Sequence, residues 1–249
     1  MGIDFIFGSM RINSLQKDDA IYLLRYMLSK GLRSFHVSYE YETYDYFRSC
    51  LFKALELERI NPNDIKYIVK LSSPNFKELI ICEEKIIEQI NNYKSSLNVK
   101  CIENIQWMLR YDLQDEKGRS DIIGKHYNVL NNIIPKLKQK NTIKYFSCFP
   151  YSFKFAEKIM KLVELDFLID YCNIIEFERF KLLHNLIKGS STKMIALKPF
   201  DGGNVFKQNI TLEKSLKFLQ NFKSIKSTVA SISSLDQFNK IWNFKYDIL

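Results

Sequence analysis

The sequence predicts an α/β protein, a single (β/α)8 TIM barrel that spans residues 1–249 as one domain. Three observations support this fold class: strand-like and helix-like segments alternate, eight strand candidates occur in one run, and no charged insertion or linker interrupts them. The first turn after a strand, GSMRI, also lacks the GxGxxG fingerprint of a classical dinucleotide-binding domain. A closed barrel therefore fits the pattern better than an open doubly wound sheet.

The strand and helix candidates follow one another from the start of the chain. Strand-like Ile3 to Gly8 precedes an amphipathic helix with apolar residues from Leu15 to Leu28, which Lys30 and Gly31 end. The next two strand candidates are Ser34 to Val37 and Lys66 to Leu71, with helices from about Thr43 to Leu57 and from near Asn75. The remaining strand candidates are Asn104 to Arg110, Ile143 to Cys148, Phe167 to Cys172, Lys193 to Lys198 and Ser227 to Ser231.

The composition indicates which cellular compartment to expect. No apolar run approaches the roughly 18 to 20 residues that a membrane span needs, and the acidic N-terminal region is unlike a signal peptide. Five cysteines, an odd number without a CxxC pair, predict reduced thiols in the cytoplasm, with Cys148 and Cys172 buried at strand ends.

The charge distribution and the barrel pattern limit the classes of binding partner that we expect. The net charge is +9, but the lysines are spread along the chain apart from one short cluster at 136–144, which argues against nucleic acid as a partner. We expect a small-molecule ligand at the carboxyl ends of the strands and no membrane partner, and a protein partner stays open. The three histidines show no spacing that would suggest a metal site.

Four strand-end turns carry recognisable motifs. Gly8 to Arg11 reads GSMR, Gly31 to Tyr41 reads GLRSFHVSYEY, Ile195 to Gly203 reads IALKPFDGG, and Ser231 to Phe238 reads SISSLDQF. In this order they resemble the GTMRL-type turn, the GIRxFDTAxxYG signature, and the MKPLGGG and GMSSPEQL segments of the aldo-keto reductases. The resemblance implies an NAD(P)H-dependent oxidoreductase that acts on a small carbonyl or sugar-like substrate.

The resemblance also implies a catalytic tetrad of Asp, Tyr, Lys and His. Tyr41 falls on the position of the proton donor and Lys70 on that of its supporting lysine. His36 stands where the family has Asp, and Tyr111 stands where it has His. An imidazole in place of the carboxylate removes the anion that would keep Lys70 charged, so standard carbonyl reduction is weakened. In a barrel, Tyr41, Lys70 and Tyr111 are expected to point into one cleft.

The same resemblance places NADPH along two segments. Lys198 and Pro199 fall on the turn beside the nicotinamide, whereas Ser231, Ser233 and Gln237 fall on the segment that binds the adenine-side phosphate. We expect the hydroxyls and helix start of that second segment to suit an anion.

The nicotinamide side departs from the family. Phe149 and Pro150 replace the Ser-Asn pair that binds the carboxamide, and Ile169 lies near the expected Gln. A buried amide without partners costs about 1 to 3 kcal/mol per unmet group. Adenosine phosphate contacts should therefore supply most of the affinity for any nucleotide, and hydride transfer should be slow or absent.

Three functions remain open from the sequence. One is an oxidoreductase with Tyr41 as acid and Lys70 as support. Another is a non-redox or catalytically inactive barrel, a pseudoenzyme that serves as a binding or scaffolding subunit. The third is a lyase or isomerase that uses a neutral Lys70 as nucleophile. We expect Tyr39 and Tyr41 to line the mouth of the site, and Tyr44 and Phe47 to pack in the core.

Overall fold

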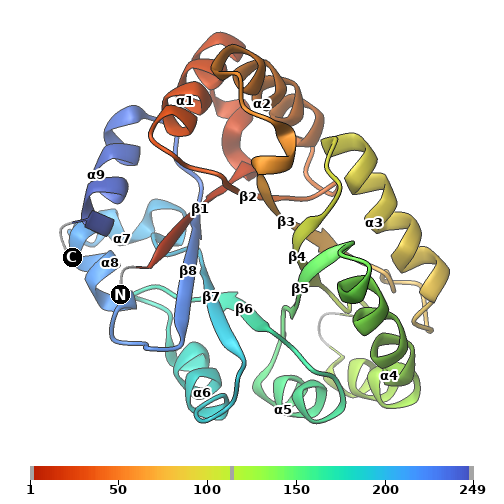
Figure 1. Cartoon of the computed structure of the whole chain (residues 1–249). Coiled ribbons are helices and arrows are strands. Elements are labelled where there is room, and N and C mark those ends of the chain that lie inside the picture. The colour runs from red at the N-terminus through yellow and green to blue at the C-terminus, as the bar shows by residue number, and fades with distance from the viewer. Residues whose placement is uncertain (1–2, 113–114, 247–249) are drawn as a thin grey trace. The chain divides into compact units, whose positions relative to one another are not determined.

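The computed structural model describes residues 3–112 and 115–246, with side chains up to residue 244. Within these ranges eight parallel strands follow one another in chain order around a closed barrel (Figure 1). The (β/α)8 prediction is therefore confirmed. The strands are β1 (Asp4–Gly8), β2 (Ser34–Val37), β3 (Lys66–Leu71), β4 (Ile102–Trp107), β5 (Ile143–Cys148), β6 (Phe167–Tyr171), β7 (Lys193–Leu197) and β8 (Ile225–Ala230).

Helices separate the strands. They are α1 (Lys17–Ser29), α2 (Tyr44–Glu58), α3 (Glu83–Leu97), α4 (Glu116–Gln139), α5 (Phe153–Leu162), α6 (Glu178–Leu186), α7 (Asn204–Lys207), α8 (Leu212–Leu219) and α9 (Leu235–Tyr246). Short 3-10 turns occupy Ser9–Ser14, Pro62–Asp64 and Asp201–Gly203. Among the described residues, no helix combines the length and the apolar character that a membrane crossing requires.

One predicted helix start is wrong. The third helix begins at Glu83 and not near Asn75. The Asn75 side chain accepts a hydrogen bond from the Phe76 N–H, and the Glu78 carboxylate accepts one from the Asn75 N–H. These local side-chain bonds offer the backbone an alternative to the helix, so residues 72–82 form a loop.

Contacts divide the chain into two compact units, which are described separately. The first unit comprises Met1–Tyr67, Tyr171–Phe177 and Ile195–Leu249, and the second comprises Ile68–Asp170 and Glu178–Met194. The one-domain organisation expected from the sequence stays a prediction.

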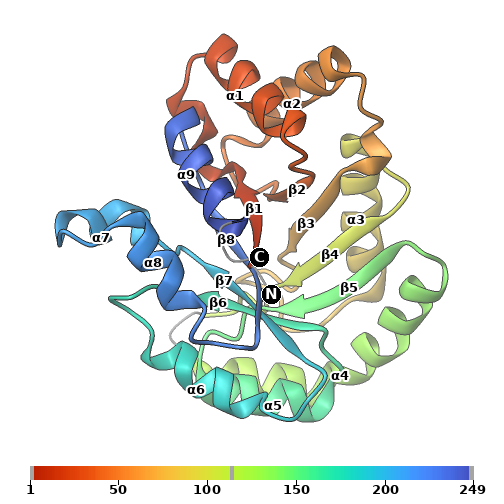
Figure 2. The same cartoon turned by 60° about the vertical axis from the view of Figure 1, so that its left-hand side comes forward.

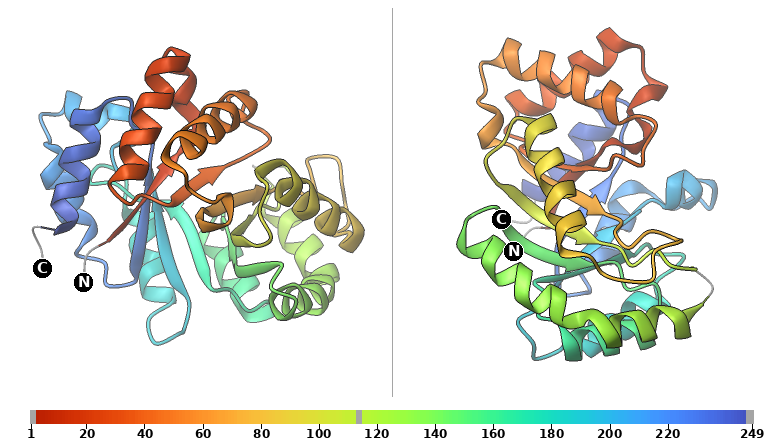
Figure 3. Two further views of the ribbon diagram at one scale, coloured as in Figure 1. Left: turned by 45° about the horizontal axis from the view of Figure 1, so that its top comes forward. Right: turned by 90° about the vertical axis from the view of Figure 1, so that its right-hand side faces the viewer.

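In the first unit, β1 pairs with β2 on one side and with β8 on the other. Helix α1 packs beside α2 and α9, as Figure 2 and the left view of Figure 3 show. Phe7 and Phe35 bring their ring centroids to 5.7–6.3 Å from that of Phe47, and all three are fully buried. Tyr44 is buried and Tyr39 is exposed. The core positions predicted for Tyr44 and Phe47 are therefore confirmed.

In the second unit, β3, β4, β5 and β6 form a continuous parallel sheet. Helix α4 packs beside α3 and α5, and α5 packs beside α6 (Figure 3). Cys148 ends β5 as a buried thiol that forms no disulfide, and Cys172 of the first unit is likewise buried and outside a disulfide. Both cysteine predictions are confirmed.

Candidate functional site

Strand register gathers several predicted site residues at one edge of the first unit. Gly8 pairs with His36 between β1 and β2, and Phe7 pairs with Ala230 between β1 and β8. The Cys172 N–H, just after β6, donates to the Leu197 carbonyl at the end of β7. Because parallel strands end at the same edge, the residues that follow these positions share the carboxyl edge, where barrels carry their sites.

His36 and Tyr41 lie together after β2. His36 is the third residue of the strand and is only 4% exposed. Its ring centroid lies 6.4 Å from that of Tyr41, which is half-buried. Backbone bonds from the Tyr41 N–H to the Ser38 carbonyl and from the Tyr44 N–H to the Tyr41 carbonyl fold this segment into successive turns. The turns hold the phenol beside the imidazole.

The turn after β7 presents a cation. Lys198 is exposed and has a left-handed backbone with φ of 52°. Its ammonium lies 4.3 Å from the centroid of the Tyr171 ring, within the range of a cation–π contact. A positive φ is unfavourable for lysine, so the turn holds this side chain in a specific direction.

A second cation contacts the same turn from the 3-10 segment that follows β1. The Arg11 guanidinium donates to the Gly202 carbonyl over 3.3 Å. Gly202 has φ of 63°, and a Cβ there would lie 3.1 Å from the Arg11 guanidinium. Pro199, between Lys198 and this glycine, is buried. Arg11 therefore contacts the loop of residues 198–203, whose first residue is Lys198.

The three residues predicted to bind the adenine-side phosphate form bonds within the chain. The Ser231 hydroxyl donates to the Gly8 carbonyl over 2.8 Å, which ties β8 to β1. The Gln237 side chain accepts from the Ser233 N–H, and its own N–H donates to the Ser234 hydroxyl. This arrangement resembles a capping box at the start of α9.

Two buried polar atoms at this edge have no hydrogen-bond partner among the described residues. They are Oγ of Ser9, which directly follows β1, and Nδ2 of Asn173, which follows β6. Both residues are at most 1% exposed. An unsatisfied buried polar atom costs about 1 to 3 kcal/mol, so this edge favours an added polar partner.

Lys70 and Tyr111 belong to the second unit. Lys70 lies on β3, is half-buried, and accepts the Tyr93 hydroxyl at its carbonyl over 2.9 Å. Tyr111 follows β4, and its ring packs on the first turn of α4, where a Cβ on Gly118 would lie 2.1 Å from Cε1. Tyr41 and His36 lie in the first unit. The shared cleft for Tyr41, Lys70 and Tyr111 stays a prediction.

A packed cluster follows β5 and β6 in the second unit. Phe149 is 6% exposed, and its ring makes an edge contact with Tyr151 at 5.0 Å between centroids. The Arg179 guanidinium lies 5.8 Å from the centroid of the Phe149 ring and donates to the Tyr151 carbonyl over 2.9 Å. Arg179 also forms a bidentate ion pair with Asp170, whose side chain is fully buried. These contacts join Phe149, Tyr151, Arg179 and Asp170 into one aromatic and ionic cluster.

Comparison with known proteins identifies the fold. No known family profile and no curated protein matches the chain. An aldo-keto reductase from Pseudomonas aeruginosa, described as putative, is similar in structure, with a TM-score of 0.73 at 12% identity over 99% of this chain and 90% of that one. The holo form of an aldo-keto reductase from Bacillus halodurans gives 0.71 at 14% identity over 97% and 86%. The aldose reductase from Schistosoma japonicum gives 0.65 at 13% identity over 98% and 87%.

The chain has the aldo-keto reductase fold. The resemblance seen in the strand-end turns is confirmed at the level of the fold. At these identities the aldo-keto reductase fold does not by itself assign an activity, because function depends on the side chains of the site.

The side chains do not fit a nicotinamide dinucleotide bound as the family resemblance implies. Phe149 and Pro150 are buried and offer no side-chain hydrogen bond to a carboxamide. On the phosphate side, the Ser231 hydroxyl and the Gln237 amide oxygen are already hydrogen bonded. Asp236 adds a carboxylate to the first turn of α9, where it pairs with Lys240 over 2.8 Å.

Sequence reasoning missed several of these residues. Tyr171, Asp170 and Arg179 have no counterpart in the motifs, and their partners become visible only in the fold. A signal for Asp170 was present, since an acidic residue on an otherwise apolar strand needs a partner when it is buried. Among the described residues, no group of three or more His, Cys, Asp and Glu side chains could hold a metal ion.

Proposed function

We propose that this chain is a barrel with the aldo-keto reductase fold that binds a small polar molecule and does not transfer hydride. The observation that carries the proposal is the packing of Phe149 against Tyr151 and Arg179, because Phe149 stands where the family resemblance puts a hydrogen-bonding partner of the carboxamide. A nicotinamide that is not held at a reacting distance loses the orientation contribution to catalysis, which is worth several kcal/mol.

The ligand site of this proposal is the carboxyl edge of the first unit. Arg11 and Lys198 supply positive charge at the loop of residues 198–203, and the aromatic ring of Tyr171 lies beneath the lysine. Ser9 and Asn173 supply buried polar atoms without partners among the described residues. Two cations, an aromatic ring and unsatisfied polar atoms are suited to a sugar-like molecule that carries an anionic group.

Calorimetric titration with NADPH and NADH tests the loss of the nicotinamide site. We expect no binding tighter than about 1 mM for either dinucleotide, which corresponds to about −4 kcal/mol. An adenosine bisphosphate should match the whole dinucleotide within a factor of about five, because the nicotinamide half adds little. Micromolar NADPH binding that is lost with the adenosine fragment alone would contradict the proposal.

A titration with sugar phosphates tests the ligand class. Glucose 6-phosphate is the first probe, and Lys198→Gln should weaken its binding about tenfold through loss of one charge-assisted contact. Lys207→Gln, an exposed lysine on α7, is the matched control and should bind the probe unchanged. An equal effect of both substitutions would indicate general charge attraction and no site.

The second candidate is an NADPH-dependent oxidoreductase, with Tyr41 as proton donor to a carbonyl and Lys70 as its support. It is favoured by one observation, the placement of the Tyr41 phenol in a rigid turn beside the buried His36. Steady-state oxidation of NADPH with simple aldehydes tests it. Robust turnover that Tyr41→Phe abolishes would establish this candidate and refute the non-redox proposal.

A scaffolding role with a protein partner and a cytoplasmic location complete the proposal. They rest on the sequence alone. Co-purification of the tagged chain from its native cells, followed by fractionation, tests both.

A further inference from the structure

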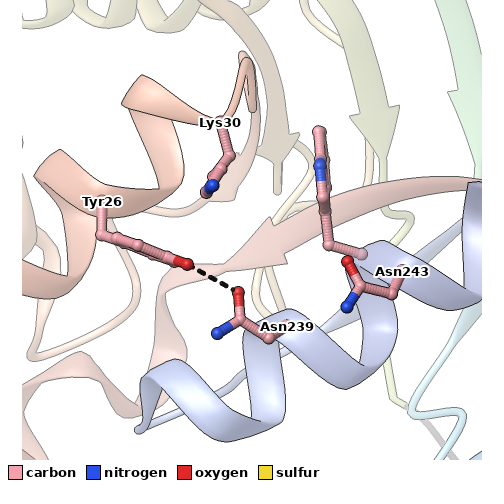
Figure 4. A pocket seen from close by; sticks show the side chains of 5 residues that line it. Tyr26, Lys30, Asn239 and Asn243 are labelled. Atoms are coloured by element: carbon pink, nitrogen blue, oxygen red, sulfur yellow. Dashed lines mark hydrogen bonds between the residues drawn. The ribbon is translucent and has the colours of Figure 1, made fainter.

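A cavity lies in the helical layer of the first unit, between α1 and α9. It has a volume of about 450 Å³ and is lined by Tyr26, Lys30, Asn239, Trp242 and Asn243 (Figure 4). Lys30 directly follows α1, shortly before β2 begins at Ser34. The cavity is therefore near the amino-terminal edge of the strands, opposite to the carboxyl edge that carries the candidate site.

Two aromatic side chains form rigid walls of the cavity. The Trp242 ring stacks on Phe238 with centroids 5.2 Å apart and planes at 30°. The Tyr26 ring contacts the same Phe238 edge-on, at 6.0 Å and 85°. Phe238 is fully buried, so one core residue positions both rings. Fixed rings lose little conformational entropy when a ligand binds.

Polar groups converge on the same space. Asn239 and Asn243 lie one turn apart on α9 and therefore project from the same helix face. The Tyr26 hydroxyl donates to Asn239 Oδ1 over 3.0 Å, which leaves the Nδ2 group of this amide as a donor (Figure 4). The second amide, of Asn243, is exposed at the cavity.

One of the described lining residues, Lys30, carries a charge. The Lys30 ammonium lies 5.4 Å from the centroid of the Tyr26 ring, and Lys30 lines the same cavity as the two amides (Figure 4). None of the five described lining residues is acidic. The site is therefore electropositive, and an anionic group on a ligand would be attracted to Lys30.

We propose that this cavity binds an acidic saccharide, a pyranose ring that carries a carboxylate. One face of a pyranose consists of C–H groups and packs against flat aromatic rings such as Trp242. Its hydroxyl edge exchanges hydrogen bonds with side-chain amides, which act as donor and acceptor at once, as Asn239 and Asn243 do. The carboxylate would pair with Lys30. The volume lies within the range of small-molecule sites.

NMR of the indole N–H groups tests the inference directly. The chain has two tryptophans, and Trp107 is fully buried with its Nε1 donating to the Ser73 carbonyl over 2.8 Å. Titration with glucuronate should shift the Trp242 indole resonance and leave that of Trp107 in place. We expect a dissociation constant of about 1 to 10 mM for glucuronate and a value about tenfold weaker for neutral glucose.

Two substitutions separate the contributions of charge and amide. Lys30→Gln should reduce glucuronate binding to the level of glucose and leave glucose unchanged. Asn243→Ala should weaken both sugars about fivefold, because it removes hydrogen bonds that both share. The matched controls are Lys17→Gln on α1 and Asn185→Ala on α6, both exposed and outside the cavity, and neither should alter binding.

Three results would overturn the inference. These are an unshifted Trp242 resonance at about 50 mM glucuronate, equal affinity for glucose and glucuronate, or full glucuronate binding by Lys30→Gln. The four substituted residues are all exposed, and the unchanged Trp107 resonance verifies that each variant is folded. None of these residues belongs to the carboxyl edge, so failure here leaves the proposed function standing.

Discussion

Replacement of Arg179 by methionine should destabilise the second unit strongly. The Asp170 side chain is fully buried, and Arg179 Nε donates to its Oδ2 over 2.7 Å while Nη2 pairs with Oδ1. The same guanidinium donates through Nη1 to the Tyr151 carbonyl. Arg179→Met keeps the aliphatic stem but leaves a buried carboxylate without its counter-ion.

The Arg179 side chain is 36% exposed and the Asp170 side chain is fully buried, so the expected loss is about 3 kcal/mol, the lower end of the range for a buried ion pair that loses one partner. For a chain of this size each kcal/mol corresponds to about 2 to 4 °C, so the melting temperature should fall by about 10 °C. Arg25→Met is the matched control. Its ion pair with Glu58 spans 2.9 Å, and the Arg25 side chain is 42% exposed. The control should cost no more than about 1 kcal/mol.

Urea unfolding followed by circular dichroism measures both variants. Asp170→Asn combined with Arg179→Met should recover much of the loss, because the double variant no longer buries a charge. A loss below about 1 kcal/mol for Arg179→Met, or no recovery in the double variant, would show that Asp170 does not depend on this pair.

Three further predictions concern local structure. Gly118→Ala should destabilise the protein by about 1 to 3 kcal/mol, because the new methyl would lie 2.1 Å from the Tyr111 ring. Gly124→Ala in the same helix meets only a flexible lysine and should stabilise it by about 0.5 to 1 kcal/mol, and thermal melts compare the two. Of the five cysteines, the three buried thiols should react with a maleimide only when the protein unfolds. Burial excludes the reagent, and it also raises the pKa of the Cys148 thiol. Labelling of more than two cysteines in the native protein, measured by mass spectrometry, would contradict this. Burial raises the pKa of the Glu78 carboxyl, but hydrogen bonds from a lysine, a serine and a backbone N–H outweigh burial and lower it overall. The Glu78 carboxylate therefore stabilises the loop above its ordinary pKa of about 4.3, and this stabilisation is lost as the pH falls through the lowered pKa. Amide resonances of residues 73–80, recorded from pH 6 to pH 3, would detect the loss. Glu78→Gln is the control, whose resonances should not depend on pH in this way.

The local sequence pattern was sufficient to predict where most of the strands lie. The spans predicted for β2, β3 and β5 coincide with the observed ones, because short apolar runs bounded by turn residues fix both type and length. The start of α3 could not be placed in this way. Asn75 and Glu78 compete with the helix through side-chain bonds whose geometry depends on how the loop folds back after β3.

The candidate site combines sequence resemblance with strand register. The resemblance of the strand-end turns selected His36, Tyr41 and Lys198, and the first unit places them at or just after the ends of β2 and β7, on its carboxyl edge. Their roles stay a prediction. Sequence motifs also assigned Ser231 and Gln237 to a phosphate. Their hydrogen bonds instead join β8 to β1 and cap α9.

By itself, the sequence determined the alternation of strands and helices, the closed barrel and the residues that follow each strand, because these depend on periodicity and turn chemistry along the chain. Tertiary structure alone decided which polar groups are already satisfied. Ser231 bonds to Gly8 at the other end of the chain, and Asp170 is neutralised by Arg179 from the next helix. Hydrogen bonds and ion pairs of this kind join residues that no local pattern relates, and they determine which side chains remain available to a ligand.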